Sequence, residues 1–388
     1  MTDRIAFSGA RIFDGERWWD DDVLIVEEGR IVGIVPAGAA VDAKRVSLQG
    51  GLLVPGLIDI QVNGGGGAQL NLTPDVQTIE TICQTYMRFG TTACLPTFIT
   101  DTRDKVAAVL AAGAEAARRG VPGFLGLHLE GPHLSVARKG AHDPALIRPM
   151  EEDDLEALVA ARETLPHLLT TVAAETVTPD QIRRLVAGGI VVSIGHSEAT
   201  HAQVKAAQQA GATLVTHLFN AQSQIGNREP GVVGAALDLG GLSASLIADG
   251  IHVHAASIGL ALRAKQGPGR ILLVTDAMSP TGTDMETFEL TGQTVYRKDG
   301  ALRLADGTLA GADLTLPDAV RYLNRELSVP LAEALRMASL YPAELMGVGG
   351  ERGRLGKGMR ADFAHLTDDL SARETFIAGE SAWRRDAA

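Results

Sequence analysis

Residues 190–218 read IVVSIGHSEATHAQVKAAQQAGATLVTHL, and this stretch indicates the fold. It opens with an apolar run, continues through a polar segment of helical character at residues 201–209, and returns to a second apolar run at residues 214–218. Two buried strands joined by a helix form a βαβ unit, in which the strands lie parallel in one sheet. Because His196 and His217 stand at the ends of these runs, the unit also brings two imidazoles to one edge of that sheet.

Apolar runs of this kind recur along the chain and alternate with helical segments. We expect eight parallel strands, at residues 54–61, 93–98, 124–129, 168–173, 190–194, 214–218, 243–248 and 271–275. The helices expected between and after them include residues 75–89, 103–118, 153–162, 179–187, 201–209, 316–327 and 331–340. Eight βα units close a barrel, so the sequence predicts an α/β protein with a (β/α)8 TIM-like barrel over residues 55–349.

The two ends of the chain have a different pattern. The first fifty-odd residues form short β-type runs separated by turn signals such as Asp14-Gly15, and the chain returns to a glycine-rich β pattern near residue 353. Residues 285–304 are also strand-like, though more polar. We therefore expect residues 1–54 and 350–388 to pair in one small β module that is discontinuous in the sequence.

Composition excludes several classes of function. The 388 residues contain 47 Asp and Glu against 35 Lys and Arg, a formal net charge of −12 without a basic stripe, which disfavours nucleic-acid binding. No apolar run reaches the roughly 18 residues of a membrane helix. Two cysteines, Cys83 and Cys94, provide no disulfide framework, so we expect a soluble protein of the cytoplasm with no membrane partner.

Polar residues directly follow several predicted barrel strands, where the active sites of such barrels lie. Glu130, His196 and His217 supply one carboxylate and two imidazoles, a ligand set found in catalytic zinc sites. One histidine at a strand end is more often a satisfied loop or core residue, but three such ligands favour a metal site. The polar residues expected to face one mouth are Gln61, Asn63, His128, Glu130, His133, His196, His217 and Asp276.

Asp276 follows the apolar run of the eighth strand and is our candidate general base. Apolar neighbours raise the proton affinity of a carboxylate, and a carboxylate beside a metal can take a proton from water and return it to a leaving group. The alternative is a helix N-cap. Gln61 and Asn63 stand where a His-x-His pair would hold a second metal, and amides are poor ligands, so we expect one metal, with both amides binding substrate beside it.

Two further signals are weaker. The run Gly64–Gly67 lacks the Lys-Ser/Thr ending of a P-loop and is more typical of a flexible loop. After the seventh strand, His252 and His254 form a His-x-His of their own, which could hold a metal or, together with Arg228, bind a phosphate.

Several motifs closely resemble the amidohydrolase superfamily and, within it, the N-acetylglucosamine-6-phosphate deacetylases. The combination of a Glu-Gly-Pro and a His-Leu-Phe-Asn-Ala run is specific to these enzymes, whereas Pro-Gly-Leu-Ile-Asp marks the superfamily alone. In chain order the matching motifs are PGLID at 55–59, HLEGP at 128–132, KGAH at 139–142, GHS at 195–197, THLFNA at 216–221, REPG at 228–231, DGIH at 249–252 and VTDA at 274–277.

The resemblance implies a fold and a set of roles. The terminal segments would form a β-sandwich beside the barrel. One divalent metal ion per subunit, zinc first and Fe²⁺, Co²⁺ or Mn²⁺ as alternatives, would be held by Glu130, His196 and His217. Asp276 would be the acid/base, and His142 would contact the acetamide carbonyl. The substrate contacts would be Asn220, Ala221, His252 and Arg228, the last from a partner subunit, which implies a homodimer.

The implied reaction is hydrolysis of the acetamide of N-acetyl-D-glucosamine 6-phosphate, in amino-sugar catabolism and cell-wall recycling. A second hypothesis keeps the barrel and metal but changes the substrate to a cyclic amide or another acetamido sugar phosphate. Cyclic-amide hydrolases typically carry a His-x-His where this sequence has Gln61 and Asn63, and a modified lysine that bridges two metals, and neither feature appears here. A third is a non-catalytic homologue with a relic pocket, which the full ligand set disfavours.

Overall fold

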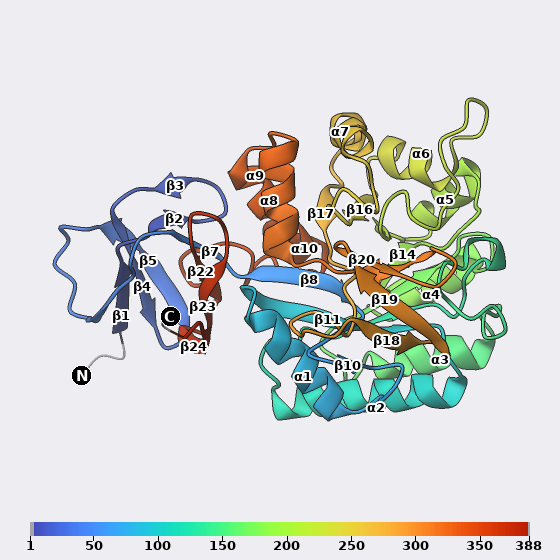
Figure 1. Ribbon diagram of the computed structural model, residues 1–388, viewed down its shortest axis with the longest axis horizontal. Helices are drawn as coiled ribbons and strands as arrows, with labels where there is room; N and C mark the ends of the chain where they lie inside the picture. Colours follow the sequence, from blue (N-terminus) through green and yellow to red (C-terminus); the bar gives the residue numbers. More distant parts are fainter. Residues whose placement is uncertain (1–3, 387–388) are drawn as a thin grey trace.

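Eight parallel strands form the central sheet of the computed structural model, which describes residues 4–386 (Figure 1). After the last strand the chain returns to the first, where Val62 pairs in parallel with Ala277. The sheet therefore closes, and the predicted TIM-like barrel is confirmed. In spatial order its strands are β8 (Leu57–Val62), β11 (Thr91–Ile99), β12 (Leu127–Glu130), β13 (Leu168–Val172), β14 (Val191–Ile194), β15 (Leu214–Val215), β16 (Ser243–Leu246) and β17 (Ile271–Leu273).

Helices surround the barrel. Those of ten residues or more are α1 (Val76–Met87), α2 (Arg103–Arg119), α3 (Glu152–Ala161), α7 (Ala255–Ala264) and α8 (Leu316–Glu326). The shorter ones are α4 (Pro179–Ala187), α5 (His201–Gln209), α6 (Gly231–Asp238), α9 (Leu331–Ala338), α10 (Leu340–Leu345) and the 3₁₀ turn η1 (Val136–Arg138). Among the described residues, no helix combines the length and apolar character that crossing a bilayer requires.

The first predicted strand, residues 54–61, belongs to two different sheets. Leu52–Pro55 forms β7, outside the barrel, and β8 begins only at Leu57. Gly56 lies between them, and a Cβ there would stand 2.0 Å from Oγ1 of Thr92. Any side chain at this position would clash with Thr92, so the junction requires glycine. The apolar run is continuous across this junction, which is why it was predicted as one strand.

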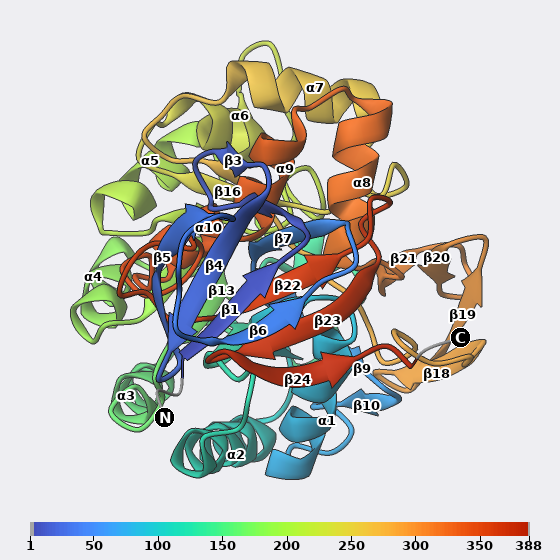
Figure 2. The same cartoon turned by 90° about the vertical axis from the view of Figure 1, so that its left-hand side faces the viewer.

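Both ends of the chain build the smaller β part, on the left in Figure 1 and facing the viewer in Figure 2. One sheet consists of β5 (Arg30–Pro36), β4 (Asp22–Glu27), β1 (Arg4–Ser8) and β6 (Lys44–Ser47). The other consists of β24 (Glu380–Arg384), β23 (Ala372–Ile377), β22 (Phe363–Leu366), β7, β2 (Arg11–Phe13) and β3 (Trp18–Trp19). The discontinuous sandwich is thus present, while its limits at residues 54 and 350 stay a prediction.

Three aromatic rings fasten the two ends together. Phe7 lies 5.0 Å from Phe363 and 5.1 Å from Phe376 between ring centroids, in edge contacts, and the two C-terminal rings stack at 4.5 Å. All three side chains are buried. Burying each ring stabilises the fold by about 2–3 kcal/mol, so the sandwich needs both ends of the chain.

A four-stranded antiparallel sheet follows the barrel's last strand and lies at its mouth, in front of the barrel in Figure 1. We call residues 287–312, which form it, the flap. Its strands are β18 (Thr287–Leu290), β19 (Gln293–Lys298), β20 (Ala301–Arg303) and β21 (Leu309–Ala312), and a short hairpin of β9 (Gly64–Gly65) and β10 (Ala68–Gln69) follows β8. The strand-like character expected of residues 285–304 is confirmed.

Candidate active site

The carboxyl ends of the barrel strands open into a cavity of about 220 Å³, which the flap covers in part. Gln61 lies in contact with its lining, whereas Arg228 is exposed and is not among the lining residues. The predicted site residues that line the cavity are Asn63, Glu130, His142, His196, His217, Asn220, Ala221, His252 and Asp276.

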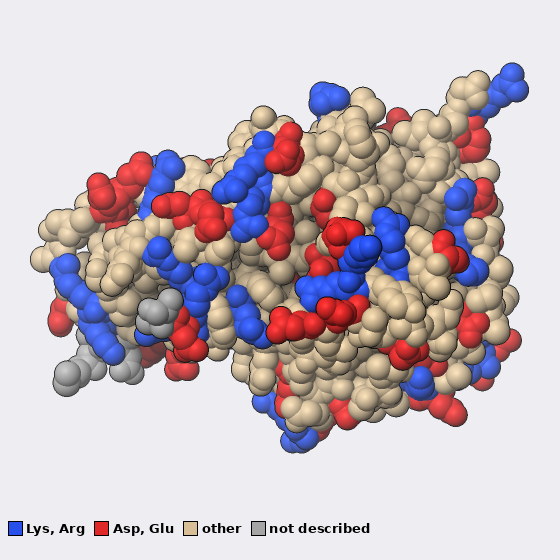
Figure 3. Space-filling view, viewed as in Figure 1, with Lys and Arg blue, Asp and Glu red and all other residues tan. Residues whose placement is uncertain are grey.

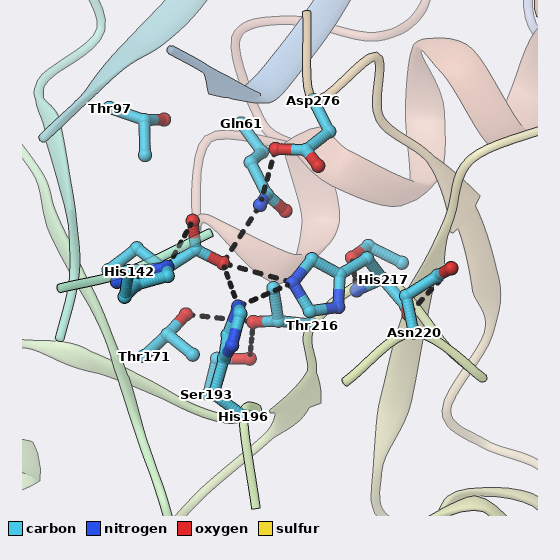
Figure 4. A network of polar contacts seen from close by, with 12 residues as sticks. Gln61, Thr97, His142, Thr171, Ser193, His196, Thr216, His217, Asn220 and Asp276 are labelled. Carbon is cyan, nitrogen blue, oxygen red and sulfur yellow. Dashed lines mark hydrogen bonds and ion pairs between the residues drawn. The ribbon is translucent and has the colours of Figure 1, made fainter. Parts of the chain in front are cut away.

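Glu130, at the end of β12, is the centre of a buried cluster of three imidazoles. Figure 4 labels these as His142, His196 and His217. Oε1 of Glu130 lies 3.1 Å from Nε2 of His217 and 3.3 Å from Nε2 of His196, and the two Nε2 atoms are 3.1 Å apart. Nε2 of His142 approaches the other carboxylate oxygen at 4.0 Å. Burial works to raise the pKa of Glu130, but His196 and His217 outweigh it and hold this pKa well below its ordinary value.

The donor set of this cluster fits a divalent metal ion. Ligand atoms about 2 Å from a tetrahedral zinc ion lie roughly 3.3 Å apart, close to the separations above. Nδ1 of His196 lies 2.8 Å from the carbonyl oxygen of Arg138 and must donate to it, so Nε2 is the ring nitrogen that can face a metal ion. Glu130, His142 and His196 offer ligand atoms within 4.8 Å of one another, and His217 lies closer still to Glu130.

His142 is fixed from outside the cluster. Its Nδ1 lies 2.8 Å from Oγ1 of Thr100, the residue that follows β11. Burial first, and then the charge of His196, lower the pKa of His142 to about 3. The ring is therefore neutral at pH 7, and His142 lines the cavity.

Asp276 is held by two amides from β8 and the residue that follows it. Its Oδ1 accepts hydrogen bonds from Nε2 of Gln61 at 3.0 Å and from Nδ2 of Asn63 at 2.6 Å, and the Gln61 amide also donates to Glu130 at 3.1 Å. Burial, and then the negative charge of Glu130, raise the pKa of Asp276 to about 6. The N-cap alternative does not apply, because β17 and the flap flank Asp276 and no helix begins there.

The backbone is left-handed at four non-glycine residues that line the cavity, one of which is Ala221 with a φ of 49°. His196, His217 and Asp276 have φ values of 46°, 32° and 53°, each just after a barrel strand. Such angles cost a non-glycine residue roughly 1–2 kcal/mol. Non-glycine residues in this region cluster at functional sites, because the rest of the fold must hold them there.

The side of the cavity beside β15 and β16 carries the residues expected to bind phosphate. Nδ1 of His252 lies 2.6 Å from a carboxylate oxygen of Asp249, which fixes the ring. Asn220 and Ala221 follow β15 on the same stretch as His217. His254 instead caps the N-terminus of α7 and is exposed, so the His-x-His pair does not converge on one point.

Two histidines expected at the mouth lie elsewhere. His128 points into the barrel one layer below Glu130, where its Nε2 lies 2.8 Å from Oγ1 of Thr171 and burial lowers its pKa to about 4. His133 lines a different cavity, between α2 and α3, and its Nδ1 donates to the carbonyl of Arg148 at 3.2 Å. The prediction of a shared mouth is wrong for these two, because strand periodicity does not fix the depth of a residue or the course of the following loop.

Sequence reasoning missed the apolar side of the cavity. Ile99, Met278, Leu290 and Leu309 line it, and the last two come from the flap. Of these four residues only Leu290 lies within residues 285–304, whose strand-like alternation was the available signal. What that pattern could not indicate was the direction in which this sheet folds over the barrel.

Comparison with known proteins places this geometry in a family. The model of the Amidohydrolase family matches residues 52–382. An N-acetylgalactosamine-6-phosphate deacetylase of Shewanella sp. (strain ANA-3) is 42% identical over 98% of this chain and 96% of its own. An N-acetylglucosamine-6-phosphate deacetylase of Haemophilus influenzae is 35% identical, over 94% of this chain and 95% of its own.

Solved structures agree over the whole chain. The crystal structure of N-acetylglucosamine-6-phosphate deacetylase from Pasteurella multocida superposes with a TM-score of 0.93 at 35% identity, covering 97% of this chain and 99% of that one. The predicted resemblance is confirmed by these matches. With its closed barrel, its clustered carboxylate and imidazoles, and its full-length relatives, the chain belongs to the amidohydrolase family.

Proposed function

We propose that this protein hydrolyses the acetamide of N-acetyl-D-glucosamine 6-phosphate to D-glucosamine 6-phosphate and acetate. The observation that carries the proposal is the half-buried carboxylate of Asp276, which two amides hold beside the cluster of Glu130, His196 and His217. The names of the full-length relatives supply the substrate class.

Glu130, His196 and His217 would hold one divalent metal ion, and we propose zinc. When bound, a zinc ion lowers the pKa of a water ligand and polarises a carbonyl oxygen. Zinc suits the mixed carboxylate and imidazole donors. Fe²⁺, Co²⁺ and Mn²⁺ are alternatives that metal analysis of the purified protein distinguishes.

The protein's own groups then move one proton twice. Oδ1 of Asp276 is engaged by Gln61 and Asn63, so Oδ2 is the atom that takes a proton from the attacking water. Nε2 of His142, held in place through Thr100, faces the carbonyl oxygen of the acetamide as charge develops on it. As the C–N bond breaks, Oδ2 returns the proton to the sugar nitrogen, and the two products are acetate and the amine.

The phosphate end of the substrate would contact Asn220, Ala221 and His252. Arg228 is exposed on the loop before α6, outside the cavity, so we propose that it acts on the site of a partner subunit in a homodimer. We also propose a cytoplasmic location, since Cys83 and Cys94 are free thiols with sulfur atoms 3.7 Å apart.

A second candidate substrate is the C4 epimer, N-acetyl-D-galactosamine 6-phosphate. It is favoured by the Shewanella relative at 42% identity and by an Escherichia coli O157:H7 relative at 36%, both named N-acetylgalactosamine-6-phosphate deacetylases. The two epimers share the acetamide and the phosphate, so the same groups would serve either reaction.

The test is acetate release from both epimers by chelated protein reloaded with one metal at a time. Wild type is expected to turn over at least one epimer, and the ratio of kcat/KM values decides between them. Asp276→Asn should keep its metal and lose at least about 100-fold in kcat. No acetate from either epimer with any metal would overturn the proposal, and an active Asp276→Asn variant would overturn the role of Asp276.

A further inference from the structure

The cavity has one apolar wall, although the proposed substrate is polar almost everywhere. Ile99, Met278 and Leu290 form this wall, with Leu309 beside them. In an N-acetylhexosamine 6-phosphate, the acetamide carries the only methyl group, which offers no hydrogen bond and gains free energy by leaving water. An apolar wall beside the scissile bond therefore matches this methyl. This inference rests on the function proposed above.

The wall lies beside the groups that would act on the acetamide. Met278 follows Asp276 by two residues, and Ile99 directly precedes Thr100, the hydrogen-bond partner of His142. On the flap side, Oγ1 of Thr291, next to Leu290, lies 3.4 Å from the carbonyl oxygen of Ala141, the residue before His142. The chain thus places this apolar wall next to His142 and Asp276, the groups proposed to act on the acetamide.

The side chains of this wall are closely packed and have little room to move away from a ligand. Met278 and Leu290 are each 2% exposed and Ile99 is 6% exposed, and all three belong to one apolar cluster with Phe288 of the flap. A Cβ at Gly311 would stand 2.4 Å from Cγ of Met278, so the flap backbone presses directly on this side chain. A close-packed wall resists added methylenes, because its neighbours cannot move without strain.

We propose that Ile99, Met278 and Leu290 form an acyl pocket that sets the length of the acyl group this enzyme removes. The flap contributes Leu290 and so takes part in substrate selection. Acetyl fits against the wall, and longer acyl chains collide with it. One methylene too many in a tight apolar pocket changes kcat/KM by about 10–200-fold.

The test compares N-acetyl, N-propionyl and N-butyryl derivatives of the hexosamine 6-phosphate that wild type prefers. Leu290→Ala is expected to raise the butyryl-to-acetyl ratio of kcat/KM at least about 10-fold over wild type. Leu302→Ala is the matched control, since Leu302 is as buried in the same cluster and does not line the cavity. It should leave the ratio unchanged. Leu290→Val, a smaller truncation, should move the ratio in the same direction if Leu290→Ala fails to fold.

The outcomes separate the acyl pocket from the function on which it rests. If wild type releases acetate and both Leu290 variants keep the wild-type butyryl-to-acetyl ratio of kcat/KM, the acyl-pocket proposal is overturned and the deacetylase function stands. An equal shift in Leu302→Ala would also overturn it, since the effect would then come from loosening the flap. If wild type releases no acetate from either epimer, both proposals fail.

Discussion

Two amide side chains determine how Asp276 is presented to the cavity. Gln61 and Asn63 both donate to its Oδ1, which leaves Oδ2 for the reacting proton. Asn63 reaches only Asp276, whereas Gln61 also donates to Glu130, a proposed metal ligand. We therefore expect Asn63→Ala to lower kcat about 100-fold with KM and metal content unchanged, because a misplaced base loses that much rate. Steady-state kinetics and metal analysis measure all three quantities.

Gln61→Ala provides the contrast for this prediction. It should lower metal occupancy as well as kcat, since Glu130 loses a hydrogen bond that orients it. The opposite pattern for Asn63→Ala, a raised KM at constant kcat, would mean that Asn63 contacts the substrate, as the sequence predicts, and does not position the base.

Asp59 carries a buried carboxyl group below the site and predicts a pH dependence of stability. Its oxygens accept hydrogen bonds from the backbone N–H of Gln61 at 3.2 Å and from Oγ1 of Thr275 at 2.6 Å, yet burial raises its pKa to about 7. In the unfolded chain the value is about 3.9. Between about pH 4 and pH 7 the folded protein therefore keeps the proton on Asp59, whereas the unfolded chain releases it. The free energy of unfolding accordingly falls as pH rises through this range.

Asp59→Asn should remove this dependence, because the amide stays neutral and can donate to Oγ1 of Thr275. We expect the Tm of the variant, relative to wild type, to be higher at pH 8 than at pH 5.5. The free-energy difference changes by at most about 1.4 kcal/mol per pH unit. Thermal unfolding at the two pH values measures it, and an unchanged difference in Tm would contradict the raised pKa.

At the level of single residues, the sequence predicted the members of the site better than their surroundings. Glu130, His196, His217 and Asp276 were found because each stands at the end of an apolar run, and parallel strands bring their carboxyl ends together. His128 and His133 were misplaced because that rule does not distinguish layers within a barrel. Leu290 was missed because it reaches the cavity only through the way the flap packs over the barrel, which the sequence pattern does not indicate.

Among the elements, local signals explain which boundaries could be predicted. Helices α4 and α5 begin and end as expected, since Thr178 and Thr200 each form a capping box with a glutamine three residues later. Helix α6 was not among the expected helices. Its residues Gly231–Leu237 are all buried, so it lacks the polar face that marks a surface helix. Burial on all sides removes the periodic signal on which such predictions rely.

One arginine joins the flap to the residues on either side of it, which makes this part of its attachment testable. Arg297 of β19 forms two hydrogen bonds with Asp313, at 2.7 and 2.9 Å, and donates to the carbonyl of Thr283 at 2.7 Å. Arg297→Ala leaves Asp313 half-buried without its charged partner, and we expect it to destabilise the flap by about 2 kcal/mol. Limited proteolysis should then cut residues 287–312 faster, and kcat/KM should fall.

Arg303→Ala is the control for the flap prediction, because exposed Arg303 donates only to the carbonyl of Gly307, within the same sheet. It should leave proteolysis and activity as in wild type. Equal rates of cleavage in the Arg297 and Arg303 variants would show that the ion pair does not hold the flap.

Over the whole molecule, positive and negative side chains are mixed and the net charge is negative. An anion can therefore be held only by particular groups close to it. Lys and Arg are interspersed with Asp and Glu on the face shown in Figure 3. With a net charge of −12, the protein as a whole repels a sugar phosphate, and long-range steering would slow its binding. Recognition of phosphate must therefore depend on a few placed groups at the cavity. His252 is the group we propose for this role, and its Nδ1 contact with Asp249 fixes the ring.

The shortage of positive charge at the cavity makes the proposed dimer testable. Arg228 is exposed and does not line the cavity, and we propose that it binds phosphate in a partner subunit. Arg228→Ala homodimers should then lose phosphate binding and Asp276→Asn homodimers should lose chemistry. Co-expression of the two would create heterodimers in which the Asp276→Asn subunit supplies Arg228 to an intact reaction centre. We expect such mixtures to regain activity that neither variant has alone, whereas mixtures no more active than the separate variants would rule out action across subunits.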